Sequence, residues 1–218
     1  MVGRANRRRR ALSRAFFSRD TTLVAREMLG AILECRGDGG VTSGRIVETE
    51  AYLGGDDPAS HAVVGRTSRT EHLFGRPGNA YVYFIYGRYW CVNAVTERAG
   101  RGHAVLVRGI EPVDGIDLMR ARRGIFGTER GLTNGPARLC LALGIDGRLN
   151  GVSLQRGPLV LREGCAIPDA AVSVSQRIGL TRAADWPLRY YVTSNPHVSR
   201  TPSAFSVGRY AAAPGARS

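Results

Sequence analysis

The sequence contains no lysine, so all 31 of its basic residues are arginines. Without a side-chain amine, the protein cannot form a lysine Schiff base with a substrate, and covalent chemistry of that kind is excluded. GC-rich coding bias is the simpler explanation for the preference for arginine. Whatever the cause of the preference, arginine suits phosphate, because its planar guanidinium donates paired hydrogen bonds to phosphate oxygens.

The patterns that bind metals or form disulfides are also missing. Cys35, Cys91, Cys140 and Cys165 lie far apart and form no C-x-x-C motif. The four histidines lack the short spacing of zinc ligands. We therefore expect no disulfide framework, no metal and no cofactor.

No apolar run approaches the length of a membrane span, and no signal-peptide core follows the basic N-terminus. The formal net charge is +13 and the pI is near 10.7, with arginines along the whole chain. This charge predicts a polyanionic partner, nucleic acid before an anionic membrane. We expect a cytoplasmic protein associated with the nucleoid of a bacterial cell. A mitochondrial transit peptide is the alternative, because no acidic residue precedes Asp20.

A chain of 218 residues with 43% hydrophobic content can bury the core of one domain, and it shows no internal repeat. Residues 1–19 are rich in arginine and are expected to form a disordered tail that adds sequence-independent DNA affinity. Residues 20–200 are expected to form the domain, and residues 201–218 a loose C-terminal tail.

The stretch Tyr81–Asn93, YVYFIYGRYWCVN, predicts a β-hairpin that turns at Tyr86 and Gly87. β-Branched and aromatic residues fill both arms, and glycine suits a tight turn that needs positive φ. Tyr86 would project from the tip. Taken alone, the hairpin favours a structural tyrosine that caps a neighbouring element. The alternative is a wedge that enters a DNA groove and replaces a displaced base.

Gly44–Leu53 is predicted to be a strand that carries two carboxylates on one face. Alternation places Ile46, Glu48, Glu50 and Tyr52 together, and side chains two residues apart lie about 7 Å from each other. One interpretation is that arginines neutralise a pair of buried acids. For Glu48 this interpretation and a functional role stay equally open, whereas for Glu50 the functional role is favoured.

Helices are predicted from the Asp20 cap to Gly30, over Val113–Arg122, and from residues 133–136 to Gly144. Further strands are predicted over residues 31–35, 103–109, 159–162 and 188–192. Residues 54–78 form a long polar segment of the kind that carries function. Arg66 and Arg69 in this segment, and Arg138 near a helix start, are candidates for DNA backbone contacts.

Six segments occur in an order that resembles one family: GRIVETEAYLG, SHA…GRT…R, PG-x-AYVYFIYG-x-Y-x-C-x-N, AVLVRGIEP, NGPARL and PLRYYV. They are similar to the alkyladenine (3-methyladenine, methylpurine) DNA glycosylases over roughly residues 20–197. The resemblance implies an α+β fold: a single mixed domain with a curved antiparallel sheet, surrounding helices and a protruding β-hairpin. It also implies hydrolysis of the N-glycosidic bond of alkylated or deaminated purines after base flipping, which leaves an abasic site in base excision repair.

The resemblance also implies roles for individual residues. Glu50 matches the general base that activates water, and Arg108 matches an arginine near that water. Tyr86 matches the intercalating residue, and Asn93 matches the residue that screens exocyclic groups. The groups that contact the flipped base correspond to Tyr52, His61 and Tyr83.

Two positions depart from the family pattern. Ser68 stands where proline is common, and Arg138 stands where lysine is common. Both departures affect DNA contacts rather than Glu50 or the aromatic residues.

The expected partner is double-stranded DNA with damaged purines, bound by a monomer. Because lysine is absent, the enzyme should be monofunctional and lack a lyase step. One alternative is a non-catalytic binder of damaged or single-stranded nucleic acid. A second alternative is a carbohydrate glycosidase that uses Glu48 and Glu50 as its acid pair. The sequence does not rank the damaged purines as substrates.

Overall fold

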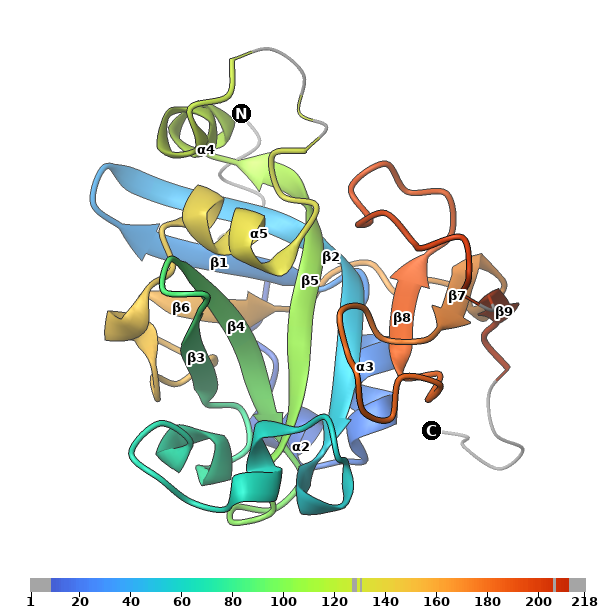
Figure 1. Cartoon of the computed structure of the whole chain (residues 1–218). Coiled ribbons are helices and arrows are strands. Elements are labelled where there is room, and N and C mark those ends of the chain that lie inside the picture. Colours follow the sequence, from blue (N-terminus) through green and yellow to red (C-terminus); the bar gives the residue numbers. More distant parts are fainter. Residues whose placement is uncertain (1–8, 127–128, 130, 206, 212–218) are drawn as a thin grey trace.

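Among the residues that the structure describes, the longest strand is β2 (Gly40–Leu53), which lies at the centre of a nine-stranded antiparallel sheet (Figure 1). One edge of β2 pairs with β5 (His103–Asp114). The other edge pairs first with β1 (Ile32–Gly37) and then with β8 (Arg189–Val192). This computed structural model describes residues 9–126, 129, 131–205 and 207–211.

The remaining strands extend this sheet in the order β3-β4-β5-β2-β8-β7-β9, with β6 paired to β1. They are β3 (Ala80–Ile85), β4 (Tyr89–Thr96), β6 (Leu159–Arg162), β7 (Val172–Ser175) and β9 (Val207–Arg209). The helices are α2 (Arg14–Phe17), α3 (Thr21–Glu27), α4 (Ile116–Arg123) and α5 (Pro136–Leu143). The predicted α+β domain with an antiparallel sheet is therefore confirmed. No helix in these described ranges is long and apolar enough to cross a membrane.

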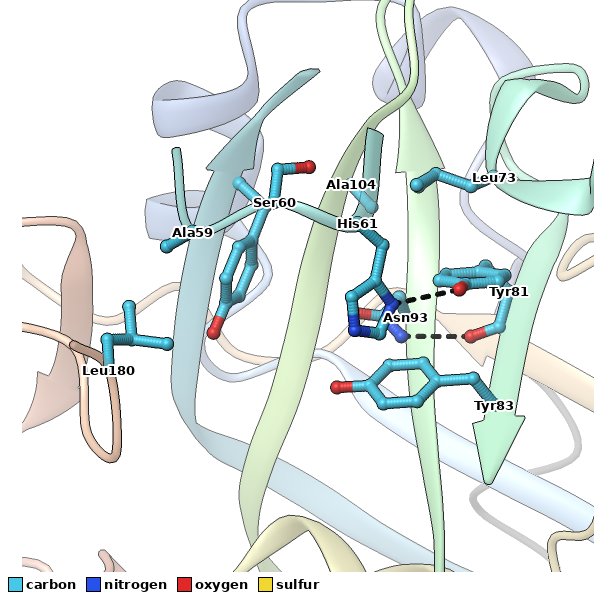
Figure 2. Close-up of a pocket in the computed structure, with 10 residues that line it drawn as sticks. Ala59, Ser60, His61, Leu73, Tyr81, Tyr83, Asn93, Ala104 and Leu180 are labelled. Atoms are coloured by element: carbon cyan, nitrogen blue, oxygen red, sulfur yellow. Dashed lines mark hydrogen bonds between the residues drawn. The ribbon is translucent and has the colours of Figure 1, made fainter. Parts of the chain in front are cut away.

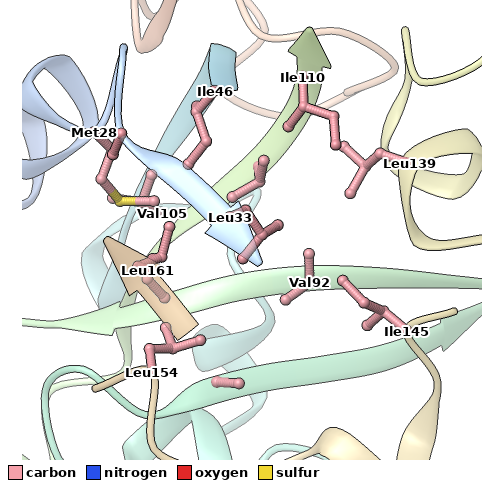
Figure 3. Packing of buried hydrophobic residues seen from close by; sticks show 14 of the residues in the cluster. Met28, Leu33, Ile46, Val92, Val105, Ile110, Leu139, Ile145, Leu154 and Leu161 are labelled. Carbon is pink, nitrogen blue, oxygen red and sulfur yellow. The ribbon is translucent and has the colours of Figure 1, made fainter. Parts of the chain in front are cut away.

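One face of the sheet packs the main hydrophobic core (Figure 3). Helix α3 contributes Val24 and Ala25, and α5 contributes Leu139 and Leu143, all of them buried. Asp20 caps α3 by accepting from the backbone N–H of Leu23, as the sequence predicts. Removal of this apolar surface from water supplies most of the driving force for folding.

The opposite face of the sheet carries the polar and aromatic residues. In β5, Val105 and Val107 join the main core, whereas the alternate residue Ala104 packs in a smaller cluster on the other side. That cluster lies under residues 54–78, which form three short 3₁₀ helices: η1 (Gly54–Asp56), η2 (His61–Val64) and η3 (Glu71–Phe74). These gather at the lower end of β2 and β5 in Figure 1.

The alternation predicted for β2 holds only after Ile46. The register against β5 shifts between Ile46 and Glu48, and again between Glu48 and Thr49. This irregularity places Ile46 in the main core, away from the carboxylates with which it was predicted to share a face. Thr49 and Ala51 remain on the core side, where the Thr49 hydroxyl donates to the carbonyl of Ala25 in α3.

Several predicted boundaries differ from the structure. The first eight residues of the predicted N-terminal tail lie outside the described residues, but residues 9–19 are folded, and Phe17 is fully buried against the core. Helix α4 begins at Ile116, because β5 continues to Asp114 and Gly115 breaks the strand at φ 71°. In the expected C-terminal tail, residues 207–209 form β9 on the edge of β7.

Candidate active site

Four strand pairings place a row of residues across the polar face of the sheet. Tyr81 in β3 lies opposite Asn93 in β4, and Asn93 lies opposite Leu106 in β5. Leu106 lies opposite Glu50 in β2, and Glu50 lies opposite Arg189 in β8. Antiparallel pairing therefore brings together the predicted catalytic glutamate and the predicted purine-screening asparagine, which are 43 positions apart in the sequence.

Three aromatic side chains form one wall of a pocket on this face (Figure 2). The rings of Tyr81 and Tyr83 stack with centroids 5.3 Å apart, and His61 meets Tyr83 edge-on at 4.5 Å. Tyr81 Oη and His61 Nδ1 are 3.0 Å apart, and Asn93 Nδ2 donates to the Tyr81 carbonyl at 2.9 Å. Leu180 contributes from the segment after β7. The pocket is thus apolar, ring-lined and edged by a few polar groups, as binding sites for flat ligands are.

Glu50 is fully buried, and three groups hold its carboxylate. Oε1 accepts from the backbone N–H of Ile178 at 2.7 Å. Oε2 accepts from the Tyr52 hydroxyl at 3.0 Å and from Arg108 Nη1 at 3.3 Å. Tyr52 and Arg108 both line the open groove beside the pocket, so they connect the buried carboxylate to it. Burial and the neighbouring Glu50 raise the pKa of Tyr52 well above its usual value, so this hydroxyl stays protonated and donates.

Glu48 has a different environment, although it lies on the same strand face. It accepts from Arg108 Nε at 3.1 Å, from Arg189 Nε at 2.7 Å, and from both the backbone N–H and hydroxyl of Ser199 at 2.7 and 2.6 Å. Burial raises the pKa of this carboxyl, but the two guanidinium charges and the hydrogen bonds outweigh that effect and leave the pKa lowered. Glu48 is therefore an ionised carboxylate neutralised by arginines, which is the structural interpretation that the sequence left open.

Arg108 bridges the two carboxylates, because Nε binds Glu48 and Nη1 binds Glu50. Its own register position in β5 is irregular, since Glu48 pairs with Gly109 and Thr49 pairs with Val107. Because Val105 and Val107 face the main core, alternation along β5 directs the side chain of Arg108 towards the polar face. The structure thus places Arg108 beside Glu50.

The sequence gives no indication of two further contributions to the site, both from the segment after β7. Arg177 is buried, forms an ion pair with Asp57, and lies over the Tyr52 ring at 4.6 Å from its centroid. Ile178 supplies the N–H that binds Glu50. Neither residue stands out in an arginine-rich chain, and they lie about 125 positions from β2 in sequence. The pairing of β7 with β8, and of β8 with β2, brings this segment to the pocket.

The hairpin of β3 and β4 turns as predicted and exposes its tip. Tyr86 and Gly87 have φ values of 51° and 62°, and the Arg88 N–H donates to the Ile85 carbonyl. This is the geometry of a two-residue hairpin turn, which needs positive φ at both central positions. Tyr86 is 88% exposed, so no helix or strand among the described residues covers its ring. The groove runs from Tyr52, His61 and Tyr83 to this tip.

The three predicted backbone-contact arginines are all exposed, but at different places. Arg69 lines the groove beside the hairpin, where its Nη2 donates to the Phe84 carbonyl. The guanidinium of Arg66 lies over the Phe74 ring, 5.7 Å from its centroid. Arg138, in the first turn of α5, donates to Oδ1 of Asn134, which precedes the helix.

The histidines make the folded protein sensitive to mild acid. Burial lowers the pKa of His61, with a further contribution from Arg69, and burial is also the main cause of the lowered pKa of His103 and His197. The unfolded chain then binds more protons below the ordinary histidine pKa of about 6.5, so the free energy of unfolding falls as pH drops through that value. Urea midpoints at about pH 7.5 and about pH 5.5 should show this loss, and His61→Gln should reduce it. A midpoint that rises on acidification would contradict the expectation.

The chain matches the model of the methylpurine-DNA glycosylase family over residues 15–196. A relative from Methanoculleus marisnigri is 49% identical over 192 residues, covering 87% of this chain and 98% of its own length. Relatives from Chlorobaculum parvum (45% over 191 residues, 87% and 91% covered) and Carboxydothermus hydrogenoformans (44% over 190 residues, 87% and 98% covered) are similar. All three carry the name "Putative 3-methyladenine DNA glycosylase".

The antiparallel sheet carries on its polar face a ring-lined pocket, one of whose lining residues, Tyr52, donates to the buried carboxylate of Glu50. The chain belongs to the methylpurine-DNA glycosylase family.

Proposed function

We propose that the protein removes damaged purines of the 3-methyladenine type from double-stranded DNA, as the first step of base excision repair. The observation that carries this proposal is the position of Glu50, whose carboxylate contacts two residues that line the groove between the aromatic pocket and the hairpin tip. A base inside a duplex is out of reach, so it must leave the stack at a cost of a few kcal/mol. Damaged bases pair and stack less well, which lowers that cost.

The hairpin provides the wedge in this proposal. Tyr86 enters the duplex and fills the space that the extruded nucleotide leaves. The purine enters the pocket between Tyr52 and the wall formed by His61 and Tyr83, and Asn93 screens its exocyclic groups. Aromatic faces attract a cationic alkylated purine, and the lowered pKa of His61 keeps that side chain uncharged at neutral pH. Arg66, Arg69 and Arg138 contact the phosphates.

Glu50 then acts as the general base. Displacement of the Tyr52 hydroxyl from Oε2 as the nucleotide enters opens a position for water next to Arg108. The carboxylate takes a proton from this water, the water oxygen bonds to the sugar C1′, and the C1′–N bond breaks with its electron pair passing to the purine. A cationic purine leaves as a neutral base, so little acid catalysis is needed. The negative charge of Glu50 also stabilises positive charge that develops on the sugar.

The direct test is to incubate the protein with alkylated duplex DNA and identify the released bases. We expect free alkylated purines and an intact abasic strand, because the chain has no lysine for a lyase step. Strand cleavage by the pure protein above the buffer background would contradict the monofunctional mechanism. Binding of lesion DNA without any base release would favour a non-catalytic binder instead.

The environment of Glu48 argues against a carbohydrate glycosidase. Such an enzyme needs two available carboxyl groups, whereas two arginines and Ser199 occupy both oxygens of Glu48. We further propose that the protein acts as a monomer in the cytoplasm, in contact with the nucleoid.

A further inference from the structure

Tyr52 has a different neighbour on each face of its ring. The ring lines both the pocket and the groove. The guanidinium of Arg177 lies 4.6 Å from the ring centroid, yet Arg177 is only 1% exposed and lines neither cavity. Arg177 therefore covers the ring face that points away from the pocket.

Asp57 neutralises this arginine. Its two carboxylate oxygens accept from Arg177 Nη1 and Nη2, the second at 2.9 Å, and neither side chain of the pair is exposed. The backbone N–H groups of Leu53 and Ala59 hold the carboxylate at 3.1 and 3.0 Å. A fully buried ion pair is weak evidence of a stabilising role, because apolar residues of similar volume often stabilise a fold as well or better.

The buried charges around the site balance. The arginines are Arg108, Arg177 and Arg189, and the carboxylates that bind them are Glu48, Glu50 and Asp57. A cationic purine stacked on the free face of Tyr52 would lie about 8 Å from the Arg177 guanidinium, the sum of the ring distance and an ordinary stacking contact. Like charges at that separation repel appreciably at the dielectric constant of a protein interior.

We propose that Asp57 determines specificity by cancelling the charge of Arg177, which allows the pocket to hold a positively charged purine. The inference deepens the proposed function and rests on it. Arg177 supports the Tyr52 ring as a rigid cation, and Asp57 removes the repulsion that this support would exert on a charged base. Neutral damaged purines do not need this compensation.

The test compares two substrates in one protein preparation. Single-turnover release of cationic 7-methylguanine and of neutral hypoxanthine from duplex DNA is measured at neutral pH, and the ratio of the two rates is taken. This ratio does not depend on the fraction of molecules that folded correctly. In Asp57→Asn we expect the ratio to fall about 30-fold, from the Coulomb repulsion at about 8 Å and an effective dielectric constant of about 20. In Arg177→Gln, which leaves the carboxylate unpaired, the ratio should rise.

The two variants should change the ratio of the release rates in opposite directions. A merely structural role would not do so, because loose packing of Tyr52 would change the ratio in the same direction in both variants. If one variant fails to fold, the sign of the other still decides. Asp146→Asn is the matched control: it removes a carboxylate from the exposed pair with Arg148, outside the pocket, and should leave the ratio unchanged. An unchanged ratio in Asp57→Asn, or a fall in Arg177→Gln, would overturn the inference. If the unmodified protein releases neither base, the proposed function itself fails.

Discussion

We expect the Glu50→Gln variant to release damaged bases about 10²- to 10⁴-fold more slowly, the range typical of losing a general base. Glutamine has almost the same shape, and its amide oxygen can still accept from Ile178 N–H. It cannot take a proton from water at neutral pH. Affinity for lesion DNA should therefore stay close to that of the unmodified protein. Single-turnover base release and a binding titration on the same duplex measure the two effects separately.

Glu34→Gln is the matched control for this substitution. Glu34 is also buried and paired with arginines, here Arg36 and Arg162, but it lies on β1 outside the site. Both variants lose one buried carboxylate that is paired with arginine, so both lose stability. Only Glu50→Gln should lose base release per folded molecule. Equal rates in the two variants would remove Glu50 from the mechanism.

We expect the Tyr86→Ser variant to lose about 5- to 150-fold in base release with little change in folding. The tyrosine is 88% exposed, so its replacement should change the free energy of unfolding by less than about 0.5 kcal/mol. In the complex, its ring would stack within the duplex, where a base–aromatic contact contributes about 1–3 kcal/mol. Base release and a fluorescence assay of base flipping report the first effect, and urea unfolding reports the second.

Phe126→Ser is the control for this variant. Phe126 is similarly exposed, at 85%, but does not line the groove. Its replacement should affect neither folding nor base release. If Tyr86→Ser lost stability and activity in proportion, the tyrosine would be a structural residue, which is the alternative that the hairpin sequence alone favoured.

Local patterns predicted much of the architecture of the site. Alternation along β2 placed Glu48, Glu50 and Tyr52 on one face, and glycine after Tyr86 predicted the turn, because both depend on neighbouring residues. The side of the sheet on which Ile46 lies could not be predicted, since a bulge is a property of two paired strands. The 3₁₀ helices that position His61 were also missed, because short turns of this kind have weak sequence signals.

The difference between the two glutamates required the tertiary structure. Both lie on one strand, two positions apart, and have the same local sequence preferences. Their partners come from elsewhere in the chain: Ser199 and Arg189 bind Glu48, whereas Ile178 binds Glu50. No periodicity connects such distant segments.

The bond between Glu48 and Ser199 spans 151 positions in the sequence. During synthesis on the ribosome, the strand that carries both glutamates emerges long before this partner. Until then, Glu48 lacks two of its hydrogen bonds, and burying it would leave a carboxylate incompletely compensated. Glu48 therefore gains its full set of hydrogen bonds only after residue 199 has been synthesised, so the polar face of β2 cannot be completed stepwise with the growing polypeptide.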